Sequence, residues 1–242
     1  MAGVVAAPRA AAGGASLPGK VLYRVGRAVV AVLLRTFARV EIQGAASVPR
    51  QGPLLVIANH VSYFDPMLLA IAVPRPLAFL AKEELFHPAP WGWALRAAGI
   101  IPVRRGHVDR QALAAAEDVL RQGGALAIFP EGRRSGDARL QAGEPGAGLL
   151  ALRSAAPVLP VALLGTERLG RPGVWMRRPR LVARCGAVWQ PRGAARAGSA
   201  AYRCVTDEMM TRLAALMPAA RRGYYADGRP ARASAGATGH EQ

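Results

Sequence analysis

The chain is poor in lysine, cysteine, aromatic residues and acidic residues. Lys20 and Lys82 are its only lysines, and 15 Asp and Glu oppose 32 Lys and Arg, which gives a formal net charge of +17 over 242 residues. Because this charge is almost entirely arginine, whose planar fork binds two oxygens at once, it suits phosphate groups. We therefore expect an anionic partner, and nucleic acid, anionic lipid and a phosphorylated substrate all remain open.

The scarcity of cysteine and of long apolar runs argues against several classes of protein. Cys185 and Cys204 have neither metal-binding nor redox spacing, so we expect free thiols in a reducing compartment. No run reaches the roughly 18 apolar residues of a membrane span, and no cleaved signal peptide is expected. Aromatic residues form 6% of the chain with no platform for stacking bases, so a nucleic-acid-binding protein is the less favoured alternative.

The length and periodicity predict one domain with short appended segments. Residues 1–18 are rich in Ala and Gly, and residues 218–242 lack periodicity. We expect the first to be a disordered N-terminal segment and the second a basic, disordered tail. Between them, over residues 40–217, apolar runs alternate with helical patterns, which predicts an α/β domain.

Residues 19–39 predict a basic amphipathic helix. Its basic positions fall within a sector of roughly 120°, opposite an apolar side. The basic positions are Lys20, Arg24, Arg27, Arg35 and Arg39, and the apolar ones are Leu22, Val29, Val30, Leu33 and Phe37. One interpretation is an ordinary surface helix docked on the core. The other is a helix that lies in the membrane interface with its arginines on anionic headgroups.

The segment NHVSYFDP, residues 59–66, follows a buried-strand pattern and precedes a helical one. In a continuous helix His60 and Asp65 would lie about 140° apart, whereas a tight turn can fold the carboxylate onto the imidazole. We expect Asp65 also to cap the helix, with Pro66 at its first position. An aspartate fixes the imidazole tautomer, and the other ring nitrogen can then take a proton from a hydroxyl. A polar turn contact without catalysis is the alternative interpretation.

Charged residues follow three further strand patterns, and strand ends are where open α/β sheets bind ligands. The strand pattern at residues 77–81 is followed by Lys82, which can approach a phosphate or stay solvated. GIIPVRRG, residues 99–106, ends in two arginines, and FPEGRRS, residues 129–135, adds a carboxylate, a glycine that allows close backbone approach, and two more arginines. The candidate binding residues are therefore Lys82, the pair Arg104 and Arg105, Glu131, Gly132, and the pair Arg133 and Arg134.

Together these motifs resemble those of the glycerolipid acyltransferases, over about residues 40–190. Residues 59–65 have the form Asn-His-x-Ser-x-x-Asp, and residues 99–105 have the form Gly-x-Ile-x-Val-x-Arg. Residues 129–135 have the form Phe-Pro-Glu-Gly-Thr-Arg-Ser, except that Arg133 replaces the threonine. The resemblance to 1-acyl-sn-glycerol-3-phosphate acyltransferases implies a single α/β domain with a mixed, mostly parallel sheet flanked by helices.

The resemblance also implies a reaction and a set of roles. A fatty acyl group would pass from acyl-CoA or acyl carrier protein to the free glycerol hydroxyl of a lysophospholipid, converting 1-acylglycerol-3-phosphate to phosphatidic acid. His60 would be the base and Asp65 its support, Arg105 and Arg134 would hold the phosphate, and Glu131 would orient an arginine or the glycerol. No metal, cofactor or covalent acyl-enzyme is expected, and the protein would be peripheral, on the cytoplasmic face of a membrane.

Two other enzymes fit parts of the sequence. A hydrolase that uses Ser62, or the His60–Asp65 pair on water, is disfavoured, because the chain has no Gly-x-Ser-x-Gly nucleophile elbow. An acyltransferase for a different lyso-lipid acceptor remains open, because the motifs report the reaction more than the acceptor.

Overall fold

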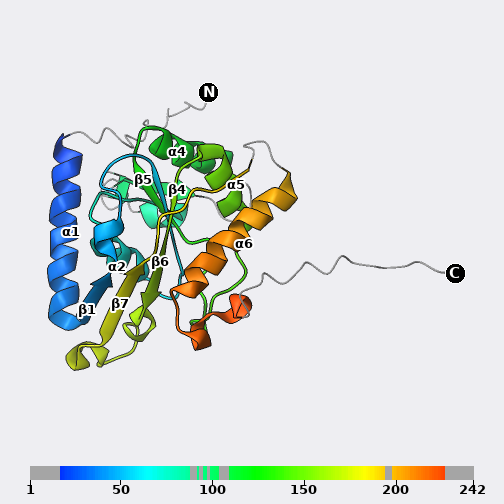
Figure 1. Cartoon of the computed structure of the whole chain (residues 1–242). Coiled ribbons are helices and arrows are strands. Elements are labelled where there is room, and N and C mark those ends of the chain that lie inside the picture. The colour runs from blue at the N-terminus through cyan, green and yellow to red at the C-terminus, as the bar shows by residue number, and fades with distance from the viewer. Residues whose placement is uncertain are drawn as a thin grey trace.

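The computed structural model describes residues 17–87, 92, 95–96, 99–103, 109–193 and 198–226 (Figure 1). Most of the segment 1–18 and the whole of Arg105 lie outside these residues. The strands are β1 (Arg39–Gln43), β2 (Leu54–Ala58), β3 (Ala78–Lys82), β4 (Ile100–Val103), β5 (Ala125–Ile128), β6 (Val158–Leu164) and β7 (Arg180–Cys185). The helices are α1 (Leu17–Phe37), α2 (Asp65–Ala72), α4 (Arg110–Arg121), α5 (Pro145–Ser154) and α6 (Ser199–Ala215).

The strands form a single seven-stranded sheet in the order β1-β7-β6-β2-β5-β3-β4. All neighbouring strands are parallel except β6 and β7, which are antiparallel. The predicted α/β domain with a mixed, mostly parallel sheet is therefore confirmed. Because β6, β2 and β5 are adjacent and parallel, the segments that follow them emerge at the same edge of the sheet.

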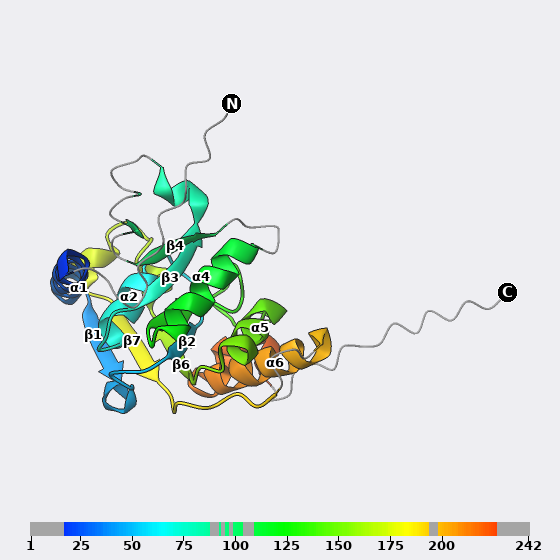
Figure 2. The ribbon, with the colours of Figure 1, turned by 90° about the horizontal axis from the view of Figure 1, so that it is seen from above.

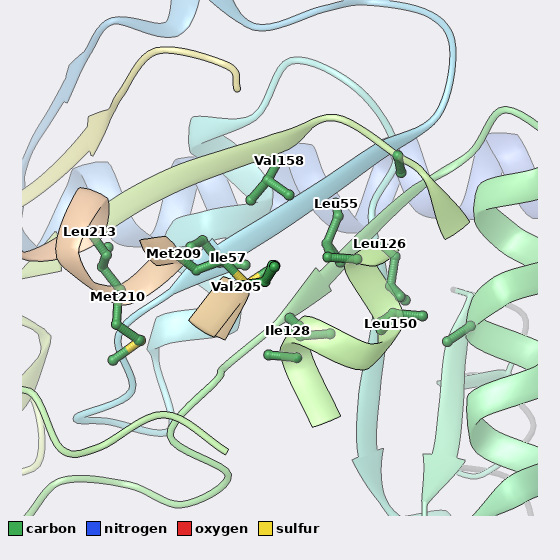
Figure 3. Packing of buried hydrophobic residues seen from close by; sticks show 14 of the residues in the cluster. Leu55, Ile57, Leu126, Ile128, Leu150, Val158, Val205, Met209, Met210 and Leu213 are labelled. Atoms are coloured by element: carbon green, nitrogen blue, oxygen red, sulfur yellow. The ribbon is translucent and has the colours of Figure 1, made fainter. Parts of the chain in front are cut away.

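Helices cover both faces of the sheet because its strands are apolar on both faces. Along β2, Leu55 and Ile57 enter the core beneath α4, α5 and α6, whereas Leu54 and Val56 enter the core beneath α1 and α2. Figure 2 shows these two helical layers on opposite sides of the strands. Figure 3 shows Leu55 and Ile57 facing side chains of α5 and α6. The sheet edge that carries the polar motifs is thereby held rigidly between two cores.

Helix α1 is docked on the core through the side that carries Arg27 and Leu34, whereas Arg24 and Arg35 stay exposed. The Arg27 guanidinium donates to the carbonyls of Ala70 (2.9 Å) and Ile71 (3.2 Å), which lie in the last turn of α2. Tyr23 accepts a hydrogen bond from the backbone of Leu77 (3.1 Å) on the same side. The prediction that Arg27 faces lipid headgroups is therefore wrong, because helix-terminal carbonyls that lack partners in their own helix attract a cation.

The opposite side of α1 is apolar and exposed. Its exposed apolar residues are Val21, Leu22, Val25, Val29, Val32, Leu33 and Phe37. At 100° per residue, most of these positions lie across the helix from Arg27. No helix within the described residues combines the length and apolarity needed to cross a membrane.

The prediction that residues 218–242 form a disordered tail is wrong for its first part, residues 218–226. Residues 219–221 and 223–225 form two short 3₁₀ turns, and Tyr225 is 1% exposed. The Tyr225 hydroxyl accepts from the Gly143 N–H (3.1 Å) and donates to Asp207 on α6 (3.1 Å). One buried aromatic side chain thus fixes a segment that has no periodicity of its own. Residues 227–242 lie outside the described part of the chain.

Candidate active site

The turn that carries His60 begins where β2 leaves the sheet, and Asn59 fixes this point. Asn59 is buried, and its side chain accepts from the Leu163 N–H (2.7 Å) and donates to the Leu163 carbonyl (2.8 Å). The side-chain amide thereby continues the pairing of β2 with β6 by one residue. His60 consequently leaves the sheet from a fixed position at its carboxyl edge.

Asp65 folds back onto this turn and is fully buried. Its Oδ2 accepts hydrogen bonds from His60 Nδ1 (2.9 Å) and from the two backbone N–H groups that follow His60 (2.6 and 2.7 Å). Its Oδ1 accepts from the Thr166 hydroxyl (2.5 Å), which follows β6. Both oxygens are therefore used by the turn and by Thr166. The expected cap by Asp65 is wrong, since the N-cap position of α2 belongs to Phe64.

The contact with Asp65 selects the tautomer of His60. Asp65 Oδ2 already accepts two backbone N–H groups, so Nδ1 completes the set as a donor and carries the ring proton. Nε2 then bears the lone pair, and no described residue hydrogen-bonds it. The His60 side chain is 12% exposed, so the imidazole as a whole is largely buried at the sheet edge. A neutral imidazole so oriented can take a proton from a bound hydroxyl.

The loop after β5 holds His60 from the other side. Glu131 Oε1 accepts from the His60 N–H (2.9 Å), and the Ser135 N–H donates to the His60 carbonyl (2.7 Å). The Phe129 ring stacks on the imidazole, with centroids 4.1 Å apart and planes 17° from parallel. Glu131 Oε2 accepts from the Gln141 N–H (2.9 Å). Backbone and ring of His60 are therefore both fixed by residues more than sixty positions away.

Glu131 holds the backbone of the His60 turn, a contact that the sequence did not lead us to expect. It is 2% exposed, both of its oxygens accept backbone N–H groups, and within the described residues no arginine pairs with it. Burial raises the pKa of Glu131 to about 7, against the two N–H groups that lower it, and the charges of Asp65 and Asp137 raise it further. Glu131 thus positions His60 and titrates close to neutral pH.

This raised pKa makes stability depend on pH. The folded state keeps the Glu131 proton to a higher pH than the unfolded chain does, so it binds more protons between about pH 4.5 and 7. Stability must then fall as the pH rises through that window and level off above it. We expect Glu131→Gln to lack this part of the pH dependence in urea unfolding followed by tryptophan fluorescence. Parallel pH profiles for wild type and variant would contradict the assignment, and Glu84→Gln, an exposed carboxylate, is the control for charge loss.

The other predicted binding residues lie at the same edge but differ in their surroundings. Arg134 is exposed, its guanidinium lies 3.7 Å from the centroid of the Tyr63 ring, and it donates to the Tyr63 hydroxyl (2.9 Å). Lys82 is exposed at the end of β3. Gly132 has φ +65°, a conformation that a side chain strains, so the turn itself requires glycine there. Of Lys82, Gly132 and Arg134, it is Arg134 that contacts the His60 turn, through the side chain of Tyr63.

An open depression of about 470 Å³ lies beside Glu131, and Arg133 lines it. Arg139, Asp137 and Glu144 also line it, so together with Glu131 its lining holds two arginines and three carboxyl groups. The depression therefore has no clear preference for an anion. Within the described residues, no cluster of three or more His, Cys, Asp and Glu is placed to hold a metal ion.

Sequence reasoning missed Thr166 and the stacking of Phe129. Thr166 is fully buried and orients Asp65, yet it stands outside every motif that was recognised. Its position directly after β6 was the available signal, because strand ends that share an edge converge. Phe129 belongs to a recognised motif, but nothing in the local sequence shows that its ring meets a side chain sixty-nine positions earlier.

The site is thus a His–Asp pair at the carboxyl edge of a helix-covered, mostly parallel sheet, an arrangement whose geometry is compatible with general-base chemistry on a hydroxyl. The sequence matches the Acyltransferase family over residues 39–164, slightly more than half of the 242 residues. The chain belongs to this family.

Named relatives and a solved structure are similar to the chain. It is 30% identical over 136 residues to the chloroplastic 1-acyl-sn-glycerol-3-phosphate acyltransferase BAT2 of Brassica napus, covering 55% of this chain and 39% of the relative. It is 28% identical over 155 residues to the 1-acyl-sn-glycerol-3-phosphate acyltransferase of Streptococcus pneumoniae, covering 62% and 57%. The crystal structure of the 1-acyl-sn-glycerophosphate acyltransferase PlsC from Thermotoga maritima superposes with TM-score 0.63 at 26% identity, covering 82% and 78%. The chain spans about two fifths of the length of the plant relative.

Proposed function

We propose that the protein transfers a fatty acyl group from acyl-CoA or acyl carrier protein to the free hydroxyl of 1-acylglycerol-3-phosphate, forming phosphatidic acid for phospholipid synthesis. The observation that carries the proposal is the contact of His60 Nδ1 with Asp65, which leaves Nε2 to accept the hydroxyl proton. The names of the relatives support the same acceptor.

The reaction follows from this geometry. The acceptor oxygen attacks the thioester carbonyl carbon while its proton moves to His60 Nε2. The buried charge of Asp65 stabilises the imidazolium that forms. The carbon–sulfur bond then breaks, and the thiolate leaves with the proton that the imidazolium returns. Ser62 is 7% exposed and its hydroxyl accepts from the Phe64 N–H (3.3 Å), so it supports the turn and is not needed as a nucleophile.

Arginines would hold the acceptor phosphate. Arg134 is exposed beside Tyr63 on the same turn as His60, so its guanidinium can reach a phosphate while the glycerol hydroxyl lies at the imidazole. Arg105 is proposed as its partner from the sequence motif alone. Lys82, at the end of β3, is proposed as a further positive charge near the incoming substrates.

The exposed apolar side of α1 supports a peripheral membrane location. Val25 and Val32 are 55% and 64% exposed and lie among further exposed apolar side chains of the same helix. A water-facing stripe of this kind normally marks an interaction site. Its occupant would be the bilayer surface that carries the lysophospholipid, with exposed Arg24 and Arg35 flanking the stripe at the level of the headgroups. A cytoplasmic face agrees with the two free thiols.

The proposal is tested by thiol release from palmitoyl-CoA with the purified full-length protein. We expect release that requires lysophosphatidic acid and yields phosphatidic acid. Release without acceptor would show a thioesterase and overturn the proposal. If acyl carrier protein replaces CoA as the donor, release should appear with palmitoyl carrier protein under the same dependence on acceptor. Release with another lyso-lipid and none with lysophosphatidic acid would reassign the acceptor.

A further inference from the structure

The connection between β6 and β7 carries an exposed apolar residue among arginines. Met176 is 87% exposed, more than any other exposed large apolar side chain of the described residues. Arg171, Arg177 and Arg178 are exposed around it, and residues 168–179 contain no Asp or Glu. We name residues 171–178 the arginine loop. A locally uncompensated positive charge around an apolar tip is chemically matched to an anionic lipid surface.

The arginine loop is fixed in place by its neighbour Trp175. The Trp175 ring packs edge-on against Phe37 at the end of α1 (centroids 6.0 Å apart) and against Phe64 (5.3 Å). Arg178 also donates to the Arg35 carbonyl of α1 (2.8 Å). The loop is therefore joined both to the helix with the apolar exposed side and to the residue that precedes Asp65. Met176 extends from this anchored position into solvent.

We propose that the arginine loop is a second membrane contact, which inserts Met176 into an anionic bilayer and places Arg171 and Arg177 on lipid phosphates. This inference rests on the proposed action on a membrane lipid and adds the surface that orients the enzyme on the membrane. If α1 were the only membrane contact, the protein could rotate about the axis of this helix. Figure 1 shows the connection between β6 and β7 beside the C-terminal end of α1. A second contact there, joined to Phe64 through Trp175, would fix the rotation and turn the His60 edge toward the lipid surface.

The test is co-sedimentation of the full-length protein with vesicles of phosphatidylcholine, alone or mixed with phosphatidylglycerol. The variant Arg171→Gln with Arg177→Gln removes two charges that make no hydrogen bond within the described residues. We expect its partition onto the mixed vesicles to fall by about 25-fold, at about fivefold for each arginine near the surface. Met176→Asp should weaken binding to both kinds of vesicle. The matched control, Arg192→Gln with Arg203→Gln, removes the same charge from exposed positions outside the loop and should change partition far less.

Equal losses in the loop variant and in the control would overturn the proposal, since net charge alone would then explain binding. Vesicle binding that is unchanged by both loop variants would overturn it as well. Activity separates this result from the proposed function. The loop variants should turn over a short-chain, water-soluble lysophosphatidic acid at the wild-type rate and lose turnover only on acceptor embedded in vesicles. Absence of transfer by the wild type on either acceptor would refute the proposed function, while the sedimentation result would still decide the membrane contact.

Discussion

Replacing His60 by alanine is expected to lower the turnover number by about 10²–10⁴-fold, the usual contribution of a general base. The loss should appear in kcat and not in the acceptor KM, because Arg134 and the rest of the edge remain. The fold should persist, since the His60 backbone is held at its N–H by Glu131 and at its carbonyl by Ser135 whatever the side chain. Thiol release from palmitoyl-CoA in the presence of lysophosphatidic acid measures the first effect, and thermal unfolding measures the second.

His87→Ala is the matched control, because His87 is exposed and lies after β3, outside the His60 turn. It should retain the wild-type kcat. A folded His60→Ala variant with nearly wild-type turnover would remove His60 from the reaction, and the buried Asp65 would then be a structural residue of the turn.

Replacing Asp65 by asparagine is expected to lower kcat by roughly 10- to 150-fold, which corresponds to loss of one charge-assisted hydrogen bond worth about 1.5–3 kcal/mol. Three N–H donors converge on Oδ2, so the asparagine must place its oxygen there and turn its amide toward Thr166. The tautomer of His60 is thereby retained, and what is lost is the negative charge beside the imidazolium. The effect should therefore be smaller than that of His60→Ala.

Substitutions of Thr166 test the orientation of the Asp65 carboxylate without removing its charge. Thr166→Val removes the hydroxyl that binds Asp65 Oδ1 but keeps the volume of this fully buried side chain, whereas Thr166→Ser keeps the hydroxyl. We expect kcat to fall in the valine variant and to recover in the serine variant. Equal kcat for wild type and Asp65→Asn, with both proteins folded, would contradict a role for the buried charge.

Most of the fold was predictable because its signals are local. Apolar runs such as residues 54–58 and 125–128 must be buried on both faces, and a strand between two helical layers is where that happens. The contact between His60 and Asp65 was predictable for the same reason. The two residues are five positions apart, and a strand-to-helix turn of this length brings the carboxylate back to the imidazole.

The orientation of α1 and the order of residues 218–226 were not predictable in this way. A helical pattern shows that arginines share one side, but not that Arg27 meets the last carbonyls of α2. The end of the chain has no periodicity, and Tyr225 is ordered by Gly143 and Asp207, which belong to distant segments.

The sequence by itself therefore determined the strands, the α/β class, and the turn that joins a histidine to an aspartate. The tertiary structure alone decided that Glu131 holds the His60 backbone, that Thr166 orients Asp65, and that Trp175 joins α1 to the active-site turn. The physical reason is the range of the interactions. Periodicity and turn chemistry act over a few residues, whereas these contacts join positions 71 to 138 residues apart. Only the packed sheet brings such residues within hydrogen-bonding or van der Waals distance.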